Sequence, residues 1–199
     1  MATTLGAAYV GVIFAGGPRA VTAEKAAAVL ADVPPSIRRV GVFANQDSAE
    51  IKRIVDIAGL DIVQLHGETT PDRIRDVRQA TNARVWPVVR VSGKLPRGIE
   101  SLIDAADGLL LDAYSPNALG GTGVSFGWEA VSLDLQTIRG ERPIILAGGL
   151  RPENVAEAIA ALSPDVVDVS SGVESAPGIK DHDRMRAFRD AVLHASIST

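Results

Sequence analysis

Residues 146–154 read Leu-Ala-Gly-Gly-Leu-Arg-Pro-Glu-Asn and continue the apolar run of residues 143–147. This stretch predicts a strand that runs into two adjacent glycines and then into the start of a helix. Glycine permits a positive φ and lets the backbone approach a ligand closely. The free N–H groups at a helix N-terminus attract anions. The turn at Gly148 and Gly149 is therefore interpreted either as half of a phosphate site or as an ordinary tight connection.

Similar apolar, β-branched runs recur on both sides of this stretch. They cover residues 8–14, 39–44, 61–65, 84–91, 108–111 and 166–169. Most of them are almost continuously apolar rather than alternating. That pattern is typical of strands in a parallel sheet whose two faces are both covered.

Helical spacing of apolar residues fills the intervals between the runs. The sets are Ile51, Ile54, Val55 and Ala58; Val155, Ala158, Ile159 and Leu162; and, more weakly, Met185, Phe188 and Val192. Asp47 with Glu50 fits a capping box. Pro71 and Pro152 are predicted at first helical positions, because the missing N–H of proline costs nothing there.

Strands that alternate with helices predict an α/β fold with right-handed crossovers. Such a chain forms either a doubly wound sheet or a β/α barrel. Helices of similar length after each strand and glycine-rich turns after the late strands favour the TIM-barrel type. No G-x-G-x-x-G follows the first strand, which argues against a dinucleotide fold. We expect about seven strand-helix units, one fewer than a complete barrel, in a single domain over residues 1–199, with no stronger internal repeat.

Composition excludes several classes of partner. The net charge is −4 with both signs interspersed, so neither nucleic acid nor an anionic membrane surface is an expected partner. The chain has no cysteine, which excludes disulfides, thiolate metal sites and a cysteine nucleophile. No signal peptide and no apolar run of membrane-spanning length are visible. A cytoplasmic location is the expectation.

A second turn of small polar residues follows the last predicted strand. Residues 168–174 read Asp-Val-Ser-Ser-Gly-Val-Glu. Serine hydroxyls and successive backbone amides suit phosphate oxygens, although Ser170, Ser171 and Gly172 also fit an ordinary turn with a serine cap. Two such turns on consecutive strands indicate a small phosphorylated ligand more specifically than either turn alone.

Three charged or titratable residues also stand at predicted strand ends. Asp112 follows Leu-Leu-Leu and precedes a long glycine-rich loop that contains Gly-Gly-Thr-Gly at 120–123. A carboxyl group there suits a general acid, or it caps the loop or pairs with an arginine. His66 follows a strand, and Arg19 follows Gly-Gly-Pro; alone, each is more often structural or solvated. No paired metal-ligand motif or P-loop is present.

Taken together, these segments resemble the phosphoribosylanthranilate isomerase family of β/α-barrel enzymes. The resemblance covers nearly the whole chain. The matching stretches are residues 10–19, 40–45, 64–67, 111–113, 120–123, 146–150, 167–174 and 178–181. Their order and spacing fit this family better than another phosphate-binding barrel enzyme, such as an epimerase or indole-glycerol-phosphate synthase.

The resemblance implies an Amadori rearrangement of N-(5-phosphoribosyl)anthranilate in tryptophan biosynthesis. An acid protonates the ribose ring oxygen, a base removes the C2 proton, and the enolamine tautomerises to the ketone without a cofactor or metal. The implied roles are: Asp112 as general acid; Arg19 at the anthranilate carboxylate; His66 lining the site; Asp168 near the sugar hydroxyls; and Gly148, Gly149, Ser170, Ser171 and Gly172 as the phosphate cradle.

One departure from the family pattern concerns the first strand. Family members open with Lys-x-Cys-Gly-x-Thr, whose cysteine is the general base, and this chain has no such segment. We therefore expect weak or absent activity, unless another residue such as Asp168 serves as base. The alternative is a non-catalytic phosphate-ligand-binding relic or truncated barrel scaffold. Two uncovered strand edges also predict self-association, which a constant monomer mass in light scattering would contradict.

Overall fold

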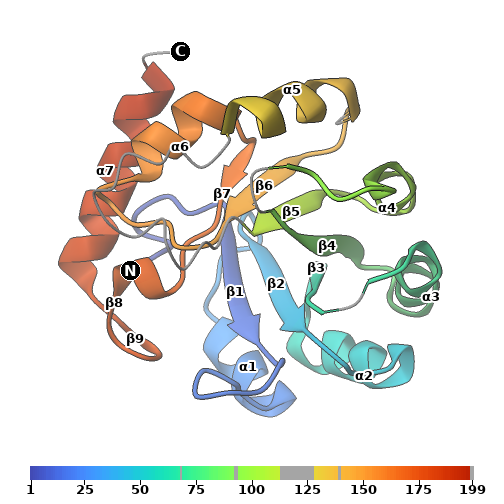
Figure 1. The fold of residues 1–199 in the computed structure, drawn as a ribbon. Helices are drawn as coiled ribbons and strands as arrows, with labels where there is room; N and C mark the ends of the chain where they lie inside the picture. The colour runs from blue at the N-terminus through green and yellow to red at the C-terminus, as the bar shows by residue number, and fades with distance from the viewer. Residues whose placement is uncertain (68, 92–93, 113–127, 139, 198–199) are drawn as a thin grey trace. The chain divides into compact units, whose positions relative to one another are not determined.

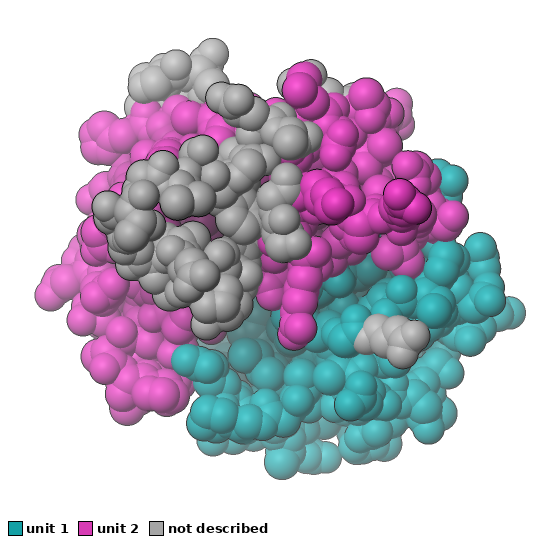
Figure 2. Space-filling view, viewed as in Figure 1, with its two compact units in different colours: residues 1–88, 104–108 teal, residues 89–103, 109–199 magenta. Residues whose placement is uncertain are grey.

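A computed structural model of the chain describes residues 1–67, 69–91, 94–112, 128–138 and 140–197 (Figure 1). It contains two compact units, coloured separately in Figure 2. The first unit comprises Met1–Val88 and Asp104–Gly108, and the second comprises Val89–Ile103 and Leu109–Thr199. The single domain remains a prediction. None of the helices described is long and apolar enough to cross a membrane.

Strands and helices alternate along the chain as predicted. The strands are β1 (Tyr9–Ile13), β2 (Arg38–Phe43), β3 (Ile62–Leu65), β4 (Arg84–Arg90), β5 (Leu109–Asp112), β6 (Ile144–Ala147) and β7 (Val166–Val167). The helices are α1 (Ala23–Leu30), α2 (Ser48–Ala58), α3 (Pro71–Thr81), α4 (Ile99–Ala105), α5 (Trp128–Ile138), α6 (Val155–Leu162) and α7 (His182–Ile197). Among the described residues these strands form a seven-stranded sheet in chain order. A doubly wound sheet reverses its strand order at a switch point, so the sequential order confirms the barrel-type prediction.

In the first unit, the apolar periodicity of the sequence becomes the core. All four residues of β3 are buried, as expected for a strand that is covered on both faces; three of them are apolar and the fourth is Gln64. Helix α2 buries the four residues predicted for its inner face, and Ile51 is 0% exposed. Burying a side chain of that size stabilises the fold by about 1.5–3 kcal/mol. Asp47 caps α2 by accepting a hydrogen bond from the N–H of Glu50 at 2.8 Å, as the capping box predicts.

The two predicted helix starts at proline have different outcomes. Pro71 is the first residue of α3, and the hydroxyl of Thr70 caps the helix. The prediction for Pro152 is wrong, because α6 begins at Val155. The side chain of Asn154 accepts from the N–H of Arg151 and donates to the carbonyl of Gly149, at 2.8 and 3.1 Å. These bonds hold a separate turn in front of the helix.

In the second unit, one face of the sheet packs against helices. Alternate residues of β5 and β6 belong to this core, whose members from the sheet are Leu109, Leu111, Ile144 and Leu146. Helices α6 and α7 contribute Val155, Ala158, Leu162 and Phe188, with Met185, Ile159 and Val192 packed against them. The faces predicted for both helices are therefore the faces that meet the core.

An aspartate one or two positions before β3, β5 and β7 joins the amino ends of two strands. The N–H of Asp61 donates to the carbonyl of Arg39, and its carboxylate accepts from the N–H of Arg39, at 2.9 and 2.8 Å. Asp107 makes the same two bonds with Val85, at 3.0 and 2.9 Å. Asp165 makes them with Ile144, at 2.9 and 2.8 Å. We call these three residues the aspartate clamps. They are an internal repeat that the sequence analysis did not find.

Strand β1 differs from β3 in the same unit. It pairs with β2 in parallel register, yet each of its five residues is at least partly exposed. Besides β2, its described bridge partner is Ala20, opposite Ile13, and an exposed strand edge is a site where another strand can add. Self-association through this edge stays a prediction.

Candidate functional site

The carboxyl ends of β5, β6 and β7 bring most of the predicted site residues together in the second unit. Side chains alternate between the two faces of a strand. Leu111 and Leu146 face the helix-packed core, so the next residue on each strand faces the opposite side of the sheet. Asp112 therefore lies at the last position of β5, half-buried, on the face away from the helices.

Asp168 takes the corresponding position after β7. Asp112 is in register with Ala147 of β6. The N–H of Asp168 donates to the carbonyl of Leu146 at 2.8 Å, which continues the parallel ladder beyond β7. Neighbouring strands lie about 4.8 Å apart, so the backbones at Asp112 and Asp168 are separated by roughly 10 Å. The two carboxylates thus flank the end of β6.

The turn after β6 has the conformation that its two glycines predict. Gly148 and Gly149 have φ values of 91° and 64°, which other residues rarely adopt. Asn154 holds the carbonyl of Gly149, and Leu150 is buried at 4% exposure. The turn is therefore anchored at its far end by packing and by a side-chain hydrogen bond.

The turn after β7 is packed directly against the turn after β6. Residues Ser171–Val173 form a short 3₁₀ helix, η1. A Cβ atom added to Gly172 would lie 1.8 Å from the carbonyl oxygen of Leu150. Only glycine permits this approach, since real Cβ atoms do not come that close to an oxygen. Gly172 therefore lets the two turns act as one structure.

Backbone donors collect on these two turns. Within the described part of the chain, no hydrogen bond uses the N–H of five residues: Gly148, Gly149, Ser170, Ser171 and Gly172. Unused N–H groups on neighbouring turns make an anion-binding concavity. The arrangement suits a phosphate group, and we call it the phosphate cradle.

Three residues beside the cradle were not predicted as site residues. They are Glu174, Lys180 and Arg184. Lys180 donates to the carbonyl of Ser170 at 2.9 Å, and Arg184 donates to the carbonyl of Gly172 at 3.0 Å. The side chain of Glu174 is 4% exposed and is paired with Lys180 at 3.1 Å. An acidic residue after Ser-Ser-Gly-Val, followed six positions later by lysine, was the available signal.

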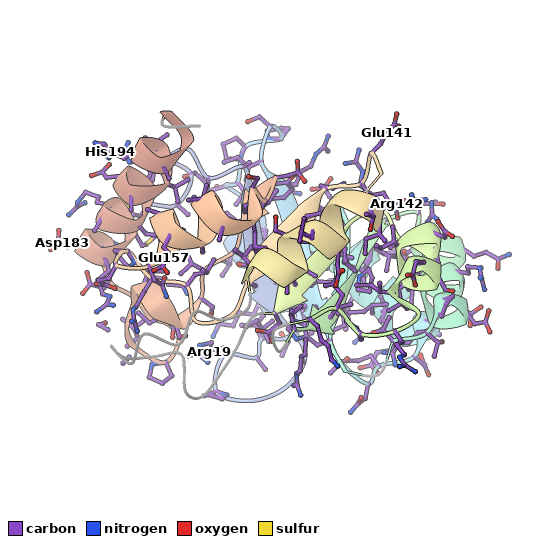
Figure 3. The ribbon with its side chains drawn as sticks, turned by 45° about the horizontal axis from the view of Figure 1, so that its top comes forward. Arg19, Glu141, Arg142, Glu157, Asp183 and His194 are labelled. Atoms are coloured by element: carbon purple, nitrogen blue, oxygen red, sulfur yellow. The ribbon has the colours of Figure 1, made fainter. Side chains whose placement is uncertain are left out.

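The other two predicted residues belong to the first unit. Arg19 lies half-buried on the connection from β1 to α1 (Figure 3). His66 follows β3, where its N–H donates to the carbonyl of Phe43 and its Nε2 lies 2.7 Å from Oε1 of the buried Gln64. Both residues follow the carboxyl end of a strand, as the sequence predicts. Ala113 and the Gly-Gly-Thr-Gly stretch at 120–123 lie outside the described residues.

A metal site was not predicted. Among the described residues, no group of three or more histidine, aspartate or glutamate side chains could hold a metal ion.

Comparison with known families identifies the chain. The family model for N-(5'-phosphoribosyl)anthranilate (PRA) isomerase matches residues 1–191. The chain belongs to this family. A PRA isomerase from Geobacter sp. (strain M21) is 44% identical over 191 residues, which are 94% of this chain and 88% of that protein.

Solved PRA isomerases share the fold. The enzyme from Thermotoga maritima superposes with a TM-score of 0.83 at 34% identity, over 97% of this chain and 91% of that one. A PRA isomerase solved in complex with reduced 1-(O-carboxyphenylamino)-1-deoxyribulose 5-phosphate has a TM-score of 0.79, 34% identity and the same coverage. The family and the barrel-type fold inferred from the sequence motifs are therefore confirmed.

Proposed function

We propose that this chain catalyses the isomerisation of N-(5'-phosphoribosyl)anthranilate to 1-(2-carboxyphenylamino)-1-deoxyribulose 5-phosphate. Its membership of the PRA isomerase family supports this reaction. The observation that carries the proposal is the joint placement of Asp112 and the phosphate cradle on three consecutive strands of the second unit. A phosphorylated sugar needs both an anion site and a nearby proton donor.

Asp112 is proposed as the general acid. It would donate a proton to the ribose ring oxygen, so that the ring C–O bond breaks with that oxygen leaving as a hydroxyl. Its carboxyl group stands at the end of a strand, on the face opposite the helices and half-buried. A side chain on a regular strand is positioned more rigidly than one on a loop. General acid catalysis of this kind contributes about 10²–10⁴-fold in rate.

The phosphate cradle is proposed to bind the 5-phosphate. Five backbone N–H groups are available there, and Gly172 holds the two turns against each other. Binding through backbone amides explains why a chain of net charge −4 can hold an anion. Asp168, on the far side of β6 from Asp112, is proposed to contact the sugar hydroxyls. By the family resemblance, Arg19 is proposed to meet the anthranilate carboxylate, and His66 is proposed to line the site.

A second candidate function is binding of a phosphorylated ligand without turnover, for which the phosphate cradle alone is sufficient. The resemblance implies a cysteine as the base that removes the C2 proton, and the sequence analysed contains no cysteine. Asp168 is a second carboxylate at this edge of the second unit and is the replacement base to test first.

Fluorescence-monitored turnover of N-(5'-phosphoribosyl)anthranilate by the purified protein, with Asp112→Asn beside it, tests the proposal. Turnover that the substitution reduces about 10²–10⁴-fold supports an isomerase with Asp112 as acid. Turnover that Asp112→Asn leaves unchanged removes Asp112 from the mechanism. No turnover by the unmutated protein, together with saturable binding of inorganic phosphate, favours the binding function.

A further inference from the structure

We propose that Lys180, held by Glu174, is a positioning residue that aims a backbone donor of the phosphate cradle at the ligand. This inference rests on the proposed function, because it presumes that the cradle binds phosphate. It assigns a role to the hairpin of β8 (Glu174–Ala176) and β9 (Ile179–Lys180), which leads from the cradle into α7 (Figure 1).

The first observation is the contact between Lys180 and the cradle. Nζ of Lys180 lies 2.9 Å from the carbonyl oxygen of Ser170. The same carbonyl receives only a long bond of 3.4 Å from the N–H of Val173. The ammonium group is therefore its stronger partner, since hydrogen bonds weaken with distance and strengthen with charge.

The planar peptide bond between Ser170 and Ser171 couples this contact to a donor on the ligand side. In a trans peptide, the carbonyl of one residue and the N–H of the next point in opposite directions, and none of the described peptide bonds is cis. When Lys180 holds the carbonyl of Ser170, the N–H of Ser171 is fixed pointing away from Lys180. That N–H is one of the five donors of the cradle, so Lys180 fixes its direction.

Glu174 explains why Lys180 remains in place. Its side chain is 4% exposed, and a buried carboxylate is costly without a cation. Glu174 and Lys180 are direct partners in the register of the hairpin, with Oε1 and Nζ 3.1 Å apart. The register of the two short strands thus places the ammonium group beside Ser170.

The hairpin has little packing of its own. Ile179 is 61% exposed, and Gly178 has a φ of 82° in the connecting turn. Since two short strands with exposed side chains add little to a core, delivery of Lys180 is the clearest role for this segment.

The test is a titration of the whole protein with inorganic phosphate. Binding is monitored through the change in the amide resonance of Ser171 in ¹H–¹⁵N NMR spectra. Lys180→Met is expected to weaken phosphate binding about tenfold, the size of one charge-assisted hydrogen bond. Lys180→Arg is expected to restore most of it. Lys52→Met is the matched control, because Lys52 is an exposed lysine of α2 paired with Asp56, and it is expected to leave binding unchanged.

Glu174→Gln distinguishes a positioning role of Lys180 from direct contact between its charge and the phosphate. If Lys180 contacts the phosphate itself, removal of the neighbouring negative charge strengthens binding, and the proposal is overturned. If Lys180 acts through Ser170, Glu174→Gln weakens phosphate binding. The variant that combines Lys180→Met with Glu174→Gln then binds phosphate no more weakly than Lys180→Met alone. For the isomerase reaction, KM is expected to rise while kcat changes little.

The outcomes also distinguish this inference from the proposed function. Phosphate binding without turnover leaves the inference testable by NMR alone. Equal affinity of Lys180→Met and the unmutated protein overturns the inference and leaves the cradle intact. No phosphate binding by the unmutated protein overturns both. Thermal unfolding of each variant identifies loss of structure. If Lys180→Met is unfolded, the phosphate affinities of Lys180→Arg and Glu174→Gln test the inference instead.

Discussion

The two ends of the same strands are built in opposite ways. At the amino ends, the aspartate clamps use both the N–H and the carboxylate of one residue to join neighbouring strands. At the carboxyl ends of β6 and β7, glycine turns leave backbone N–H groups without an acceptor among the described residues. One end satisfies its polar groups internally, and the other keeps them available.

This difference separates stability from function along each strand. The available donors at the carboxyl end belong to exposed or half-buried residues and add no bond between strands. The clamps stabilise the other end of the same sheet. In β/α barrels the carboxyl end carries the site and the amino end carries stability. Substitution of a clamp should therefore change stability without changing turnover, and substitution of Asp112 should change turnover without changing stability.

The largest expected effect is at Asp112. Asp112→Asn should lower turnover by about 10²–10⁴-fold, because the amide cannot donate the proton that the acid supplies. The midpoint of thermal unfolding should change little. Steady-state kinetics and thermal unfolding of the same preparation check both parts. A large fall in unfolding temperature would place Asp112 with the stabilising residues instead.

The next effect is expected at Gly172. Gly172→Ala places a Cβ 1.8 Å from the carbonyl oxygen of Leu150, so the two turns must separate. The free energy of unfolding should fall by about 3 kcal/mol, and phosphate binding should be lost. Gly11→Ala is the control, because a Cβ there meets its nearest neighbour at 3.9 Å. Urea unfolding and phosphate titration measure the two effects, and unchanged phosphate affinity would contradict the coupling of the turns.

A smaller effect is expected at an aspartate clamp. Asp107→Ala removes the acceptor of the Val85 N–H and the partner of Arg78, which lies 2.9 Å away. The free energy of unfolding should fall by about 2 kcal/mol. Turnover per folded molecule should not change. The exposed Asp76 of α3 provides the control substitution, Asp76→Ala. Equal destabilisation by both substitutions would show that the clamp adds nothing.

The smallest effect concerns acid pH and the start of α7. The carboxylate of Asp181 accepts from the N–H groups of Asp183 and Arg184, and the bond from Arg184 is the main cause that lowers the pKa of Asp181 below 3.8. A lowered pKa stabilises the fold above the unfolded value, and this stabilisation is lost as the pH falls through the folded value. Asp181→Ala should therefore lower the unfolding temperature at pH 6, and this effect should diminish as the pH falls below 3.8. An effect of constant size over that range would exclude the carboxylate as its source.

Local sequence patterns predicted most of the fold. The apolar runs gave the strands to within a few residues, and the helical spacing gave the buried faces of α2 and α6. Both patterns depend on neighbours along the chain, so they are visible in one sequence. The start of α6 was predicted wrongly because the side chain of Asn154 bonds to the backbone of Arg151 and Gly149. The presence of Pro152 gives no information about these bonds.

Features that depend on distant pairing were harder to predict. The aspartate clamps join residues 21 or 22 positions apart, so an aspartate before a strand looks like any turn residue. Lys180 was visible in the motif at 178–181, but its contact with Ser170 depends on the register of the hairpin. The candidate residues of the cradle were visible because glycine and serine mark strand ends directly.

The clamps also show where the chain is modular. They join β2 to β3, β4 to β5, and β6 to β7, so strands are tied in consecutive pairs and β1 stands apart. A break in the connection through α3 or through α5 would keep every clamp inside one fragment. A break through α2 or α4 would place the two bonded residues of one clamp in different fragments. Recombination that exchanges strands in these pairs therefore preserves the bonding of the amino ends, whereas exchange of single strands does not.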